Sequence, residues 1–342
     1  MIRVGVIGYG YWGPNLVRNV SETPGAAAAW VSDLSRERLD AARARYPALR
    51  VSADYRDLIE APDVDAVVVA TPVATHFEIA LRALRAGKHV LVEKPITTTS
   101  GQAARLIDEA AARGLCLMVD HTFVYHGAVR KIREIVDSGD LGDVYYFDST
   151  RVNLGIFQRD VNVLWDLAVH DLSILDCLVD ERPVAVSATG MSHVAGGAAN
   201  IAYLTLFFGG TKIAHIHVNW LAPVKVRRTL IGGSRKMIVY DDLEPSEKVK
   251  VYDKGITVED RPDDIHRLRI GYRSGDMWAP SFDTAEALRA EMAHFVTCID
   301  KGLTPETDGE AGLRVVEILE AATRSLGSRG RTVELRSGVP TG

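Results

Sequence analysis

The sequence lacks an apolar run that could cross a membrane as a helix. Such a span needs about 18 uncharged apolar residues, and no stretch of the 342 residues approaches that length. The opening segment Met1–Gly13 is apolar but short, and it lacks the charged head and the small-residue cleavage site of a secretory signal. We therefore expect a cytoplasmic protein without a membrane partner.

Cysteine is scarce, and basic residues are not in excess. Cys116, Cys177 and Cys298 make no C-x-x-C pair, which predicts small apolar residues in a reducing compartment rather than redox or metal ligands. Lys and Arg number 40 against 45 Asp and Glu, a formal net charge of -5. The chain therefore has no bulk basic field that would favour nucleic acid or anionic lipid as a partner.

Three catalytic signatures are also absent. The sequence contains no G-x-S-x-G, no P-loop glycine-lysine motif and no H-E-x-x-H, which disfavours elbow hydrolases, P-loop phosphoryl transfer and zincin chemistry. With 47% hydrophobic and 25% charged residues, the composition is that of an ordinary globular protein. At about 150 residues per domain, the length predicts two domains.

The first third of the chain alternates short β-branched runs with helical stretches. The runs that we predict as strands are Ile2–Ile7, Ala27–Asp33, Asp65–Thr71, Lys88–Val92 and Leu115–Asp120. Alternation of strand and helix predicts parallel strands joined by crossovers. We therefore expect a doubly wound Rossmann domain of the α/β class over residues 1–122.

The pattern changes after residue 122. Alternating, strand-like runs separated by glycine pairs predict an α+β domain with an open, mostly antiparallel sheet over residues 123–342. A helix at 163–178 interrupts the strands, and helices at 285–301 and 310–326 follow them. Asp253–Pro280 is polar with little periodicity, which predicts a loop or lid. One apolar face of an open sheet needs a cover, so we predict a homodimer or homotetramer formed through it.

A dinucleotide-binding motif follows the first predicted strand. Gly8, Gly10 and Gly13 form G-x-G-x-x-G directly before a helix, and Asp33 ends the second strand 20 residues after Gly13. In such motifs the glycines admit a pyrophosphate and the acid meets the ribose hydroxyls. The carboxylate favours NAD, whereas Arg36 leaves NADP as an alternative because a guanidinium could meet a 2′-phosphate.

Glu93, Lys94 and Pro95 follow the strand at Lys88–Val92. They are therefore predicted at the carboxyl edge of the parallel sheet, where open α/β folds bind ligands. A lysine there could reach the reacting end of a nicotinamide, although a surface salt bridge would explain the tripeptide alone. The proline also raises the option of a cis Lys94–Pro95 bond.

Together these segments resemble the Gfo/Idh/MocA family of oxidoreductases. The resemblance rests on the glycine motif, Ala70-Thr71-Pro72 with Thr75-His76, Gly87 to Pro95, and Trp165 to Asp171, and it covers essentially the whole chain. Gly10 to Asn15 and Thr307 to Glu310 are most similar to members that act on amino sugars or nucleotide-linked sugars. The family implies a cofactor domain and an open-sheet domain, with hydride transfer between a sugar carbinol and nicotinamide.

The resemblance also implies roles for individual residues. The lysine at Lys94 touches the substrate hydroxyl, and the histidine at His170 is the acid/base. With the glycine motif, the residues expected near the cofactor are Tyr11, Trp12, Thr71, Pro72, His76 and Glu93. For Tyr11 and Trp12, packing between the domains is the alternative.

The residues themselves suit this chemistry. Asp166 and His170 lie four apart on a predicted helix, so both project from one face, and the carboxylate could orient the imidazole. Alcohol oxidation requires a proton acceptor, which a neutral imidazole supplies, and a cationic lysine would stabilise the developing alkoxide. The adjacent Asp171 stays open as the partner of Lys94 or His170. Core packing and helix capping remain the alternative for each residue taken alone.

Other residues are candidates for contact with the substrate. Segments expected to face the cleft contain Tyr125, Arg151, Asn153, Asn162 and Trp165. His215 and His217 alternate on one strand face but lack a third ligand, so no metal site is predicted.

The sequence therefore predicts an NAD(P)-dependent dehydrogenase that oxidises a secondary hydroxyl of an amino sugar or nucleotide-linked sugar, with C3 as the candidate position and a biosynthetic role. Three alternatives stay open: an NADPH-dependent ketoreductase, a redox-neutral epimerase or glycosidase that retains NAD, and a non-catalytic nucleotide sensor.

Overall fold

The chain divides into two compact units, each built from two stretches of sequence. The computed structural model describes residues 1–155, 161–259 and 269–335. The first unit comprises Met1–His126 and Ala285–Glu320, and the second comprises Gly127–Thr284 and Ala321–Gly342. The sequence analysis predicts a single boundary at residue 122. In the structure, the later helix α8 (Ala287–Lys301) also belongs to the first unit, where it packs against α1 and η1.

The first unit contains the predicted parallel sheet, which confirms the Rossmann domain. Its six strands run in the order β3-β2-β1-β4-β5-β6, and every neighbouring pair is parallel. Their bounds are β1 Ile2–Ile7, β2 Ala26–Ser32, β3 Arg50–Ser52, β4 Ala66–Val69, β5 His89–Glu93 and β6 Leu117–Asp120. The strand order reverses between β1 and β4, and a reversal of this kind creates the crevice in which doubly wound folds bind dinucleotides.

Helices connect these strands. They are α1 Gly13–Glu22, α2 Arg36–Arg45, α3 Tyr55–Glu60, α4 Val73–Arg85 and α5 Ser100–Arg113, followed by the short 3₁₀ helix η1 Thr122–Tyr125. Local capping sets their ends: the Thr99 side chain accepts from the Gln102 amide at the start of α5, and Gly114 closes it at φ 62°. All four residues of β4 are buried, as expected for a central strand with cover on both faces.

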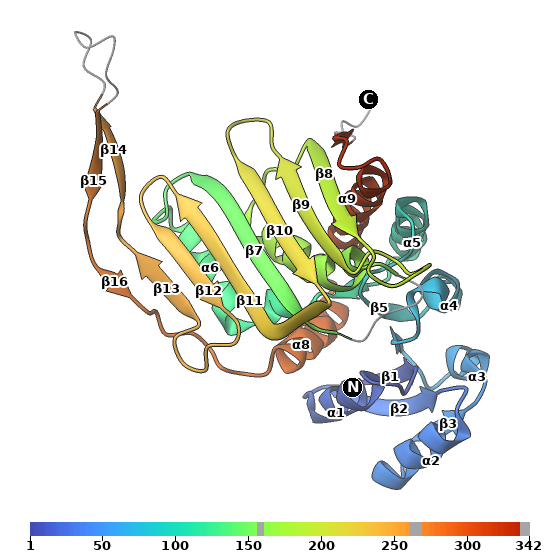
Figure 1. Ribbon diagram of the computed structural model, residues 1–342. Helices are drawn as coiled ribbons and strands as arrows, with labels where there is room; N and C mark the ends of the chain where they lie inside the picture. The colour runs from blue at the N-terminus through green and yellow to red at the C-terminus, as the bar shows by residue number, and fades with distance from the viewer. Residues whose placement is uncertain (156–160, 260–268, 336–342) are drawn as a thin grey trace. The chain divides into compact units, whose positions relative to one another are not determined.

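The second unit contains a nine-stranded mixed sheet (Figure 1). Its order is β16-β13-β12-β11-β7-β10-β9-β8-β17, and β7 with β10 is the one parallel pair among these described strands. The strand bounds are β7 Val144–Leu154, β8 Ala185–Met191, β9 Ile201–Phe207, β10 Ile213–Asn219, β11 Leu221–Gly233, β12 Met237–Asp241, β13 Val249–Tyr252, β16 Met277–Trp278 and β17 Val333–Glu334. The predicted open, mostly antiparallel sheet is thus confirmed.

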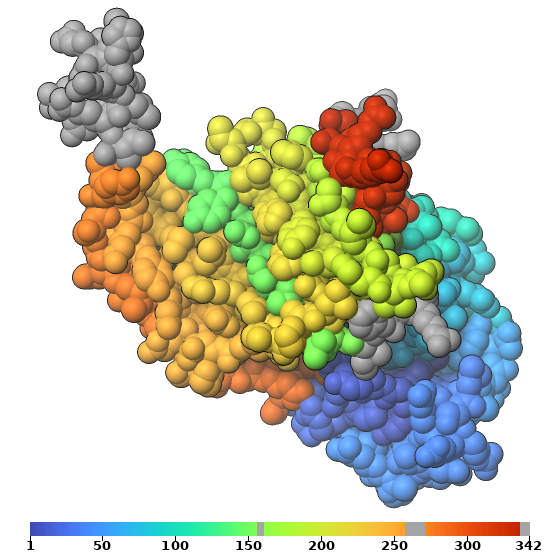
Figure 2. Space-filling model, viewed as in Figure 1, coloured from blue at the N-terminus to red at the C-terminus, as the bar shows by residue number. Residues whose placement is uncertain are grey.

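Helices of this unit are α6 Gly127–Asp137, the π-helical turn η2 Leu164–Ala168 and α7 Val169–Leu178, with the end of α9 (Gly309–Gly327). Figure 1 shows α6 behind the sheet. Among the described residues of this unit, no helix covers the face turned to the viewer, which Figure 2 shows as a continuous surface. Tyr203 and Phe207 on β9 and Ile213 on the neighbouring β10 are exposed at 42%, 37% and 42%.

The predicted loop or lid at Asp253–Pro280 is wrong in part. β14 (Gly255–Glu259) and β15 (Arg269–Arg273) pair as an antiparallel hairpin, and β16 joins the edge of the large sheet. Short alternation in Gly255–Glu259 is the signal that the sequence reading overlooked. The part of the predicted loop at 260–268 lies outside the described residues. In the described part of the chain, no helix is both long and apolar enough to cross a bilayer.

Candidate active site

The glycine loop occupies the turn between β1 and α1. Gly8 has a φ of 99°, and a Cβ there would lie 2.3 Å from the Ala70 carbonyl oxygen. A Cβ on Gly13 would lie 2.4 Å from the Gly8 carbonyl oxygen, so both positions require glycine. At Gly10 an added Cβ would meet only Arg38 Nη1, at 3.6 Å, among the described atoms. The space above Gly10 thus fits the approach of a diphosphate to backbone amides.

Asp33 follows β2 and is held against this loop. Its Oδ2 accepts from the Tyr9 amide at 2.7 Å, and its Oδ1 accepts from the Ser35 amide at 2.8 Å. Arg38 Nη1 lies 3.5 Å from Oδ2. The carboxylate is therefore fixed at the end of β2, where ribose hydroxyls bind in doubly wound folds.

The guanidinium beside Asp33 belongs to Arg38 rather than to Arg36. Arg36 is highly exposed, and its Nε lies 3.7 Å from Asp40 Oδ1. Sequence reasoning missed Arg38, although Ser35 is a strong N-cap residue that accepts from the Arg38 amide and so places that residue in the first turn of α2. The predicted choice between NAD and NADP therefore turns on Asp33 and Arg38.

Aromatic and polar residues surround the loop. Tyr11 and Trp12 are exposed at 83% and 47%, and their rings meet edge to face at 5.5 Å. His76 is buried on α4, with Nδ1 2.9 Å from the Pro95 carbonyl oxygen and Nε2 2.8 Å from the Thr71 carbonyl oxygen. Burial lowers the pKa of His76. The ring therefore links the turn after β4, which includes Pro72, to the segment after β5.

Lys94 directly follows β5 at the carboxyl edge of the sheet. The Lys94–Pro95 bond is cis, the option that the proline had raised. Glu93 is the register partner of Asp120 on β6, and the charge of Lys94 acts on both carboxyl groups and on His121. Burial is the main cause that raises the pKa of Glu93 well above its usual range. Sequence reasoning missed Asp120, which ends a strand at the same edge.

The second unit carries the other predicted catalytic residues. Asp166 lies in the π-helical turn η2, and its Oδ2 accepts from Trp220 Nε1 at 2.9 Å. His170 lies in the first turn of α7, and its carbonyl oxygen accepts from the Ser173 hydroxyl at 2.8 Å. The predicted helix at 163–178 thus begins with a π turn. The prediction that Asp166 and His170 project from one face assumed α-helical spacing, and a π turn changes that spacing. Convergence of Lys94 and His170 on one substrate stays a prediction.

The predicted substrate contacts lie in different settings. Asn162 caps η2 by accepting from the Leu164 amide at 3.0 Å, and Trp165 Nε1 donates to the Thr323 hydroxyl at 2.9 Å. Asn153 lies near the end of β7. Tyr125 is buried in the first unit, where its hydroxyl lies 3.0 Å from Thr307 Oγ1. Burial raises the pKa of Tyr125, so this residue packs the interior around η1.

Arg151 lies in the interior of the second unit, where it pairs with Asp171. Its Nε donates to Asp171 Oδ2 at 2.8 Å and its Nη2 to Oδ1 at 3.2 Å. Ser149 also donates to Asp171 Oδ1, at 2.8 Å. Asp171 is thus the partner of Arg151. The sequence analysis had left open whether Asp171 would pair with Lys94 or with His170. Contact of Arg151 with a substrate stays a prediction without support from this placement.

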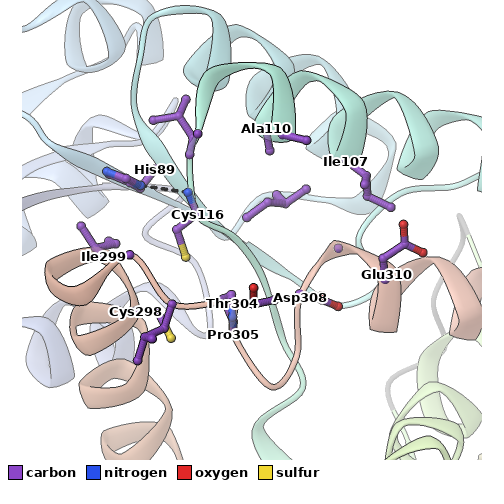
Figure 3. A pocket seen from close by; sticks show the side chains of 17 residues that line it. His89, Ile107, Ala110, Cys116, Cys298, Ile299, Thr304, Pro305, Asp308 and Glu310 are labelled. Atoms are coloured by element: carbon purple, nitrogen blue, oxygen red, sulfur yellow. Dashed lines mark hydrogen bonds between the residues drawn. The ribbon is translucent and has the colours of Figure 1, made fainter.

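A cavity of about 370 Å³ lies elsewhere in the first unit (Figure 3). His89 at the start of β5 and Cys116 just before β6 line it, and the Cys116 amide donates to His89 Nδ1 at 2.9 Å. Lys94 and Asp120 follow the opposite ends of these strands, so the cavity is not the predicted cofactor crevice. Burial raises the pKa of the Cys116 thiol to about 12, which makes the thiol unreactive.

No group of three or more His, Cys, Asp or Glu side chains in the described ranges is arranged to hold a metal ion. His215 and His217 instead stack against Tyr203, with ring centroids 6.3 and 4.5 Å away.

Two family models match the chain. "Oxidoreductase family, NAD-binding Rossmann fold" matches residues 2–121, and "GFO/IDH/MocA C-terminal domain" matches residues 129–239. The oxidoreductase YdgJ of Escherichia coli is 31% identical over 72% of this chain and 73% of its own.

Several relatives have names that state a reaction, and two of them act on nucleotide-linked sugars. UDP-N-acetylglucosamine 3-dehydrogenase of Acidithiobacillus ferrooxidans is 30% identical over 92% of this chain and 94% of its own. Its crystal structure superposes with a TM-score of 0.79 at 26% identity and covers 96% of this chain and 98% of that one. The dTDP-3,4-didehydro-2,6-dideoxy-α-D-glucose 3-reductase of Streptomyces violaceoruber is 46% identical over 33% of each chain.

Proposed function

The chain belongs to the GFO/IDH/MocA oxidoreductase family and is an NAD(P)-dependent enzyme that acts on CH–OH groups; from that premise we propose that it oxidises the C3 hydroxyl of a nucleotide-linked amino sugar. The observation that carries this proposal is the similarity to UDP-N-acetylglucosamine 3-dehydrogenase, which extends over both units and covers 92% of the chain. A biosynthetic role follows from the activated, nucleotide-linked form of such a substrate.

NAD is the proposed cofactor. The open space above Gly10 and the fixed carboxylate of Asp33 fit a dinucleotide whose ribose carries free hydroxyls, since a 2′-phosphate would be repelled by that carboxylate. When bound, the nicotinamide ring supplies the hydride acceptor. Tyr11 and Trp12 are the exposed rings beside this loop and are proposed to cover the bound cofactor.

The chain's own residues are proposed to handle the proton and the developing charge. Lys94 donates to the reacting hydroxyl and stabilises its oxygen as the proton leaves. His170 accepts that proton at its imidazole, and Asp166 orients the ring or the substrate. Asn153, Asn162 and Trp165 are proposed to bind the sugar.

The test is a substrate panel with the purified protein. UDP-N-acetylglucosamine, a dTDP-deoxysugar, a free amino sugar and inositol are each mixed with NAD, and NADH formation is followed by absorbance. We expect the wild type to turn over the UDP-linked amino sugar, and the Lys94→Met variant to turn over the same substrate about 10²-fold to 10³-fold more slowly. Turnover of inositol alone would contradict the proposal, and bound cofactor without net NADH would favour the redox-neutral alternative.

A ketoreductase is the second candidate. The 46% identity to a dTDP-sugar 3-reductase lies over a third of the chain, and Arg38 Nη1, 3.5 Å from Asp33 Oδ2, is a cation that could meet a 2′-phosphate. The discriminating measurement is the ratio of kcat/KM for NADPH and NADH with a 3-keto sugar. A ratio far above unity would favour reduction as the physiological direction.

We also propose a homodimer or homotetramer in the cytoplasm, formed through the exposed face of the large sheet. The exposed Tyr203, Phe207 and Ile213 on neighbouring strands support it. Light scattering at micromolar concentration should give a mass at least twice that of one chain, and a monomer would refute this assembly.

A further inference from the structure

Three carboxyl groups lie together at the carboxyl edge of the first unit's sheet. Glu93 ends β5 and is paired in register with Asp120, which ends β6. Glu291 comes from α8, which packs against η1 directly after β6. Glu291 is 0% exposed and Asp120 is 4% exposed. If all three groups were ionised, two buried carboxylates would thus lie beside the half-buried carboxylate of Glu93.

The hydrogen bonds around Glu291 do not suit an ionised group. Neither of its oxygens accepts a hydrogen bond of normal geometry within the described chain. Thr122 has one hydroxyl proton, and that proton is donated to Asp120 Oδ1. A buried carboxylate without donors is strongly disfavoured, whereas a neutral carboxylic acid is itself a donor. Asp120 is the acceptor beside it.

The neighbouring charges point to the same arrangement. Burial and the adjacent Asp120 raise the pKa of Glu291 well above its usual range, and burial raises the pKa of Glu93 likewise. Burial also raises the pKa of Asp120, but the Thr122 hydroxyl, Glu291 and the charge of Lys94 lower it. Asp120 is therefore the group of the three that ionises first.

His121, which follows Asp120 in the chain, adds no positive charge to the cluster at neutral pH. Burial lowers the pKa of His121 to about 3, with further lowering by Lys94 and Arg314. Tyr125, on η1, is a neutral phenol that lies 3.0 Å from Thr307. Lys94 is thus the cation whose charge acts on Glu93 and Asp120.

We propose that Glu291 is a positioning residue for Lys94: as a neutral carboxylic acid it donates a hydrogen bond to Asp120, and so leaves Asp120 as the single carboxylate that faces the amine. Glu93 is neutral in the same way. Asp120, held by Thr122 and the two acids, then fixes where the Lys94 amine lies. The inference rests on the proposed role of Lys94 in the oxidation.

The first test compares two substitutions at Glu291. The amide of Glu291→Gln can still donate to Asp120, so we expect kcat within about threefold of the wild-type value. Glu291→Leu removes the donor, and we expect kcat to fall about tenfold to a hundredfold with the KM for NAD unchanged, because a displaced lysine affects the reacting centre. Asp300→Asn, an exposed position on α8, is the matched control and should match the wild type.

The second test needs no substrate. A neutral Glu291 keeps its proton in the folded state above 4.5, the ordinary pKa, whereas the unfolded chain releases it. The wild type should therefore lose thermal stability relative to Glu291→Gln as the pH rises from about 5 to about 8. Infrared spectra at pH 7 should show a carboxylic-acid carbonyl band that is reduced in Glu291→Gln and unchanged in Asp300→Asn.

The outcomes separate this inference from the proposed function. A folded Glu291→Leu variant with wild-type kcat, or equal losses in the Gln and Leu variants, would overturn the positioning role. A Tm difference between wild type and Glu291→Gln that does not change with pH would overturn the neutral acid. If no sugar is oxidised by any variant, the proposed function fails, and the stability and infrared results still decide whether Glu291 carries a proton.

Discussion

Both units bury charged side chains, but they do so in opposite ways. In the second unit Arg151 and Asp171 form a two-point ion pair of 2.8 and 3.2 Å, and Ser149 completes the coordination of the carboxylate. In the first unit Glu93, Asp120 and Glu291 lie together, and the charge of Lys94 acts on Glu93 and Asp120. In the second unit each buried charge has an opposite charge beside it, whereas in the first unit carboxyl groups outnumber the lysine that acts on them.

This difference distinguishes charges that are buried to stabilise the fold from charges that are buried near a reacting group. A buried pair of opposite charges satisfies itself and needs nothing from outside the fold. A buried cluster of like groups costs stability and shifts pKa values, and such clusters are concentrated at active sites. We therefore expect the loss of the Arg151–Asp171 pair to act mainly on stability, and the loss of Lys94 to act mainly on turnover.

Breaking the ion pair should produce the largest effect, and the effect should be on stability. Replacement of Asp171 by Leu leaves the Arg151 charge buried without its partner, so we expect a loss of about 3–5 kcal/mol in the free energy of unfolding. Urea denaturation followed by circular dichroism measures it. The double variant Arg151→Met with Asp171→Leu should recover much of the loss, and no recovery would argue that the pair is not self-contained.

Removing the amine at the like-charged edge should affect turnover instead. For Lys94→Met we expect kcat to fall about 10²-fold to 10³-fold, because a donor to the developing alkoxide is lost. The free energy of unfolding of this variant should fall by at most about 1 kcal/mol relative to the wild type. A folded Lys94→Met variant with the wild-type kcat would contradict a role for this edge of the sheet in the reaction.

His170→Ala should reduce kcat by about 10²-fold, the usual contribution of a positioned general base. We also expect the loss to shrink as the pH rises, because hydroxide and water replace the imidazole as proton acceptor. Initial rates from about pH 6 to about pH 10 measure both effects. A loss that is independent of pH would show that His170 packs or binds without accepting a proton.

The smallest effect is expected at the distant ribose end of the site. Arg38→Ala removes the cation 3.5 Å from Asp33 Oδ2. If NAD is the cofactor, the KM for NAD should change by less than about threefold while any activity with NADP falls by about tenfold. A large loss with NAD alone would show that Arg38 holds the ribose or the adenine and does not select between the two cofactors.

Local sequence signals predicted most of the first unit. The glycine spacing and Asp33 located the turn after β1, and uninterrupted apolar runs located the central strands. β3 was missed because Arg50–Ser52 has three residues, too few for a periodic pattern. The hairpin of β14 and β15 was missed because its short alternation lies within a polar stretch.

The features that were missed at the site are non-local. Nothing near Glu291 in the sequence shows that α8 returns to the first unit and buries this side chain against Asp120. Likewise, Arg151 and Asp171 are 20 residues apart, and their pairing depends on how α7 packs on β7. Arg38 could be found only in part, because an N-cap at Ser35 predicts both Arg36 and Arg38 in the first turn of α2 and does not choose between them.

The most direct test of the account is a crystal structure with NAD and UDP-N-acetylglucosamine bound. The account predicts that Lys94 Nζ and a His170 ring nitrogen both lie within about 3.2 Å of the same sugar hydroxyl. It would be contradicted if the two groups approached different atoms of the substrate, or if either lay beyond about 5 Å from the hydroxyl with no bridging water.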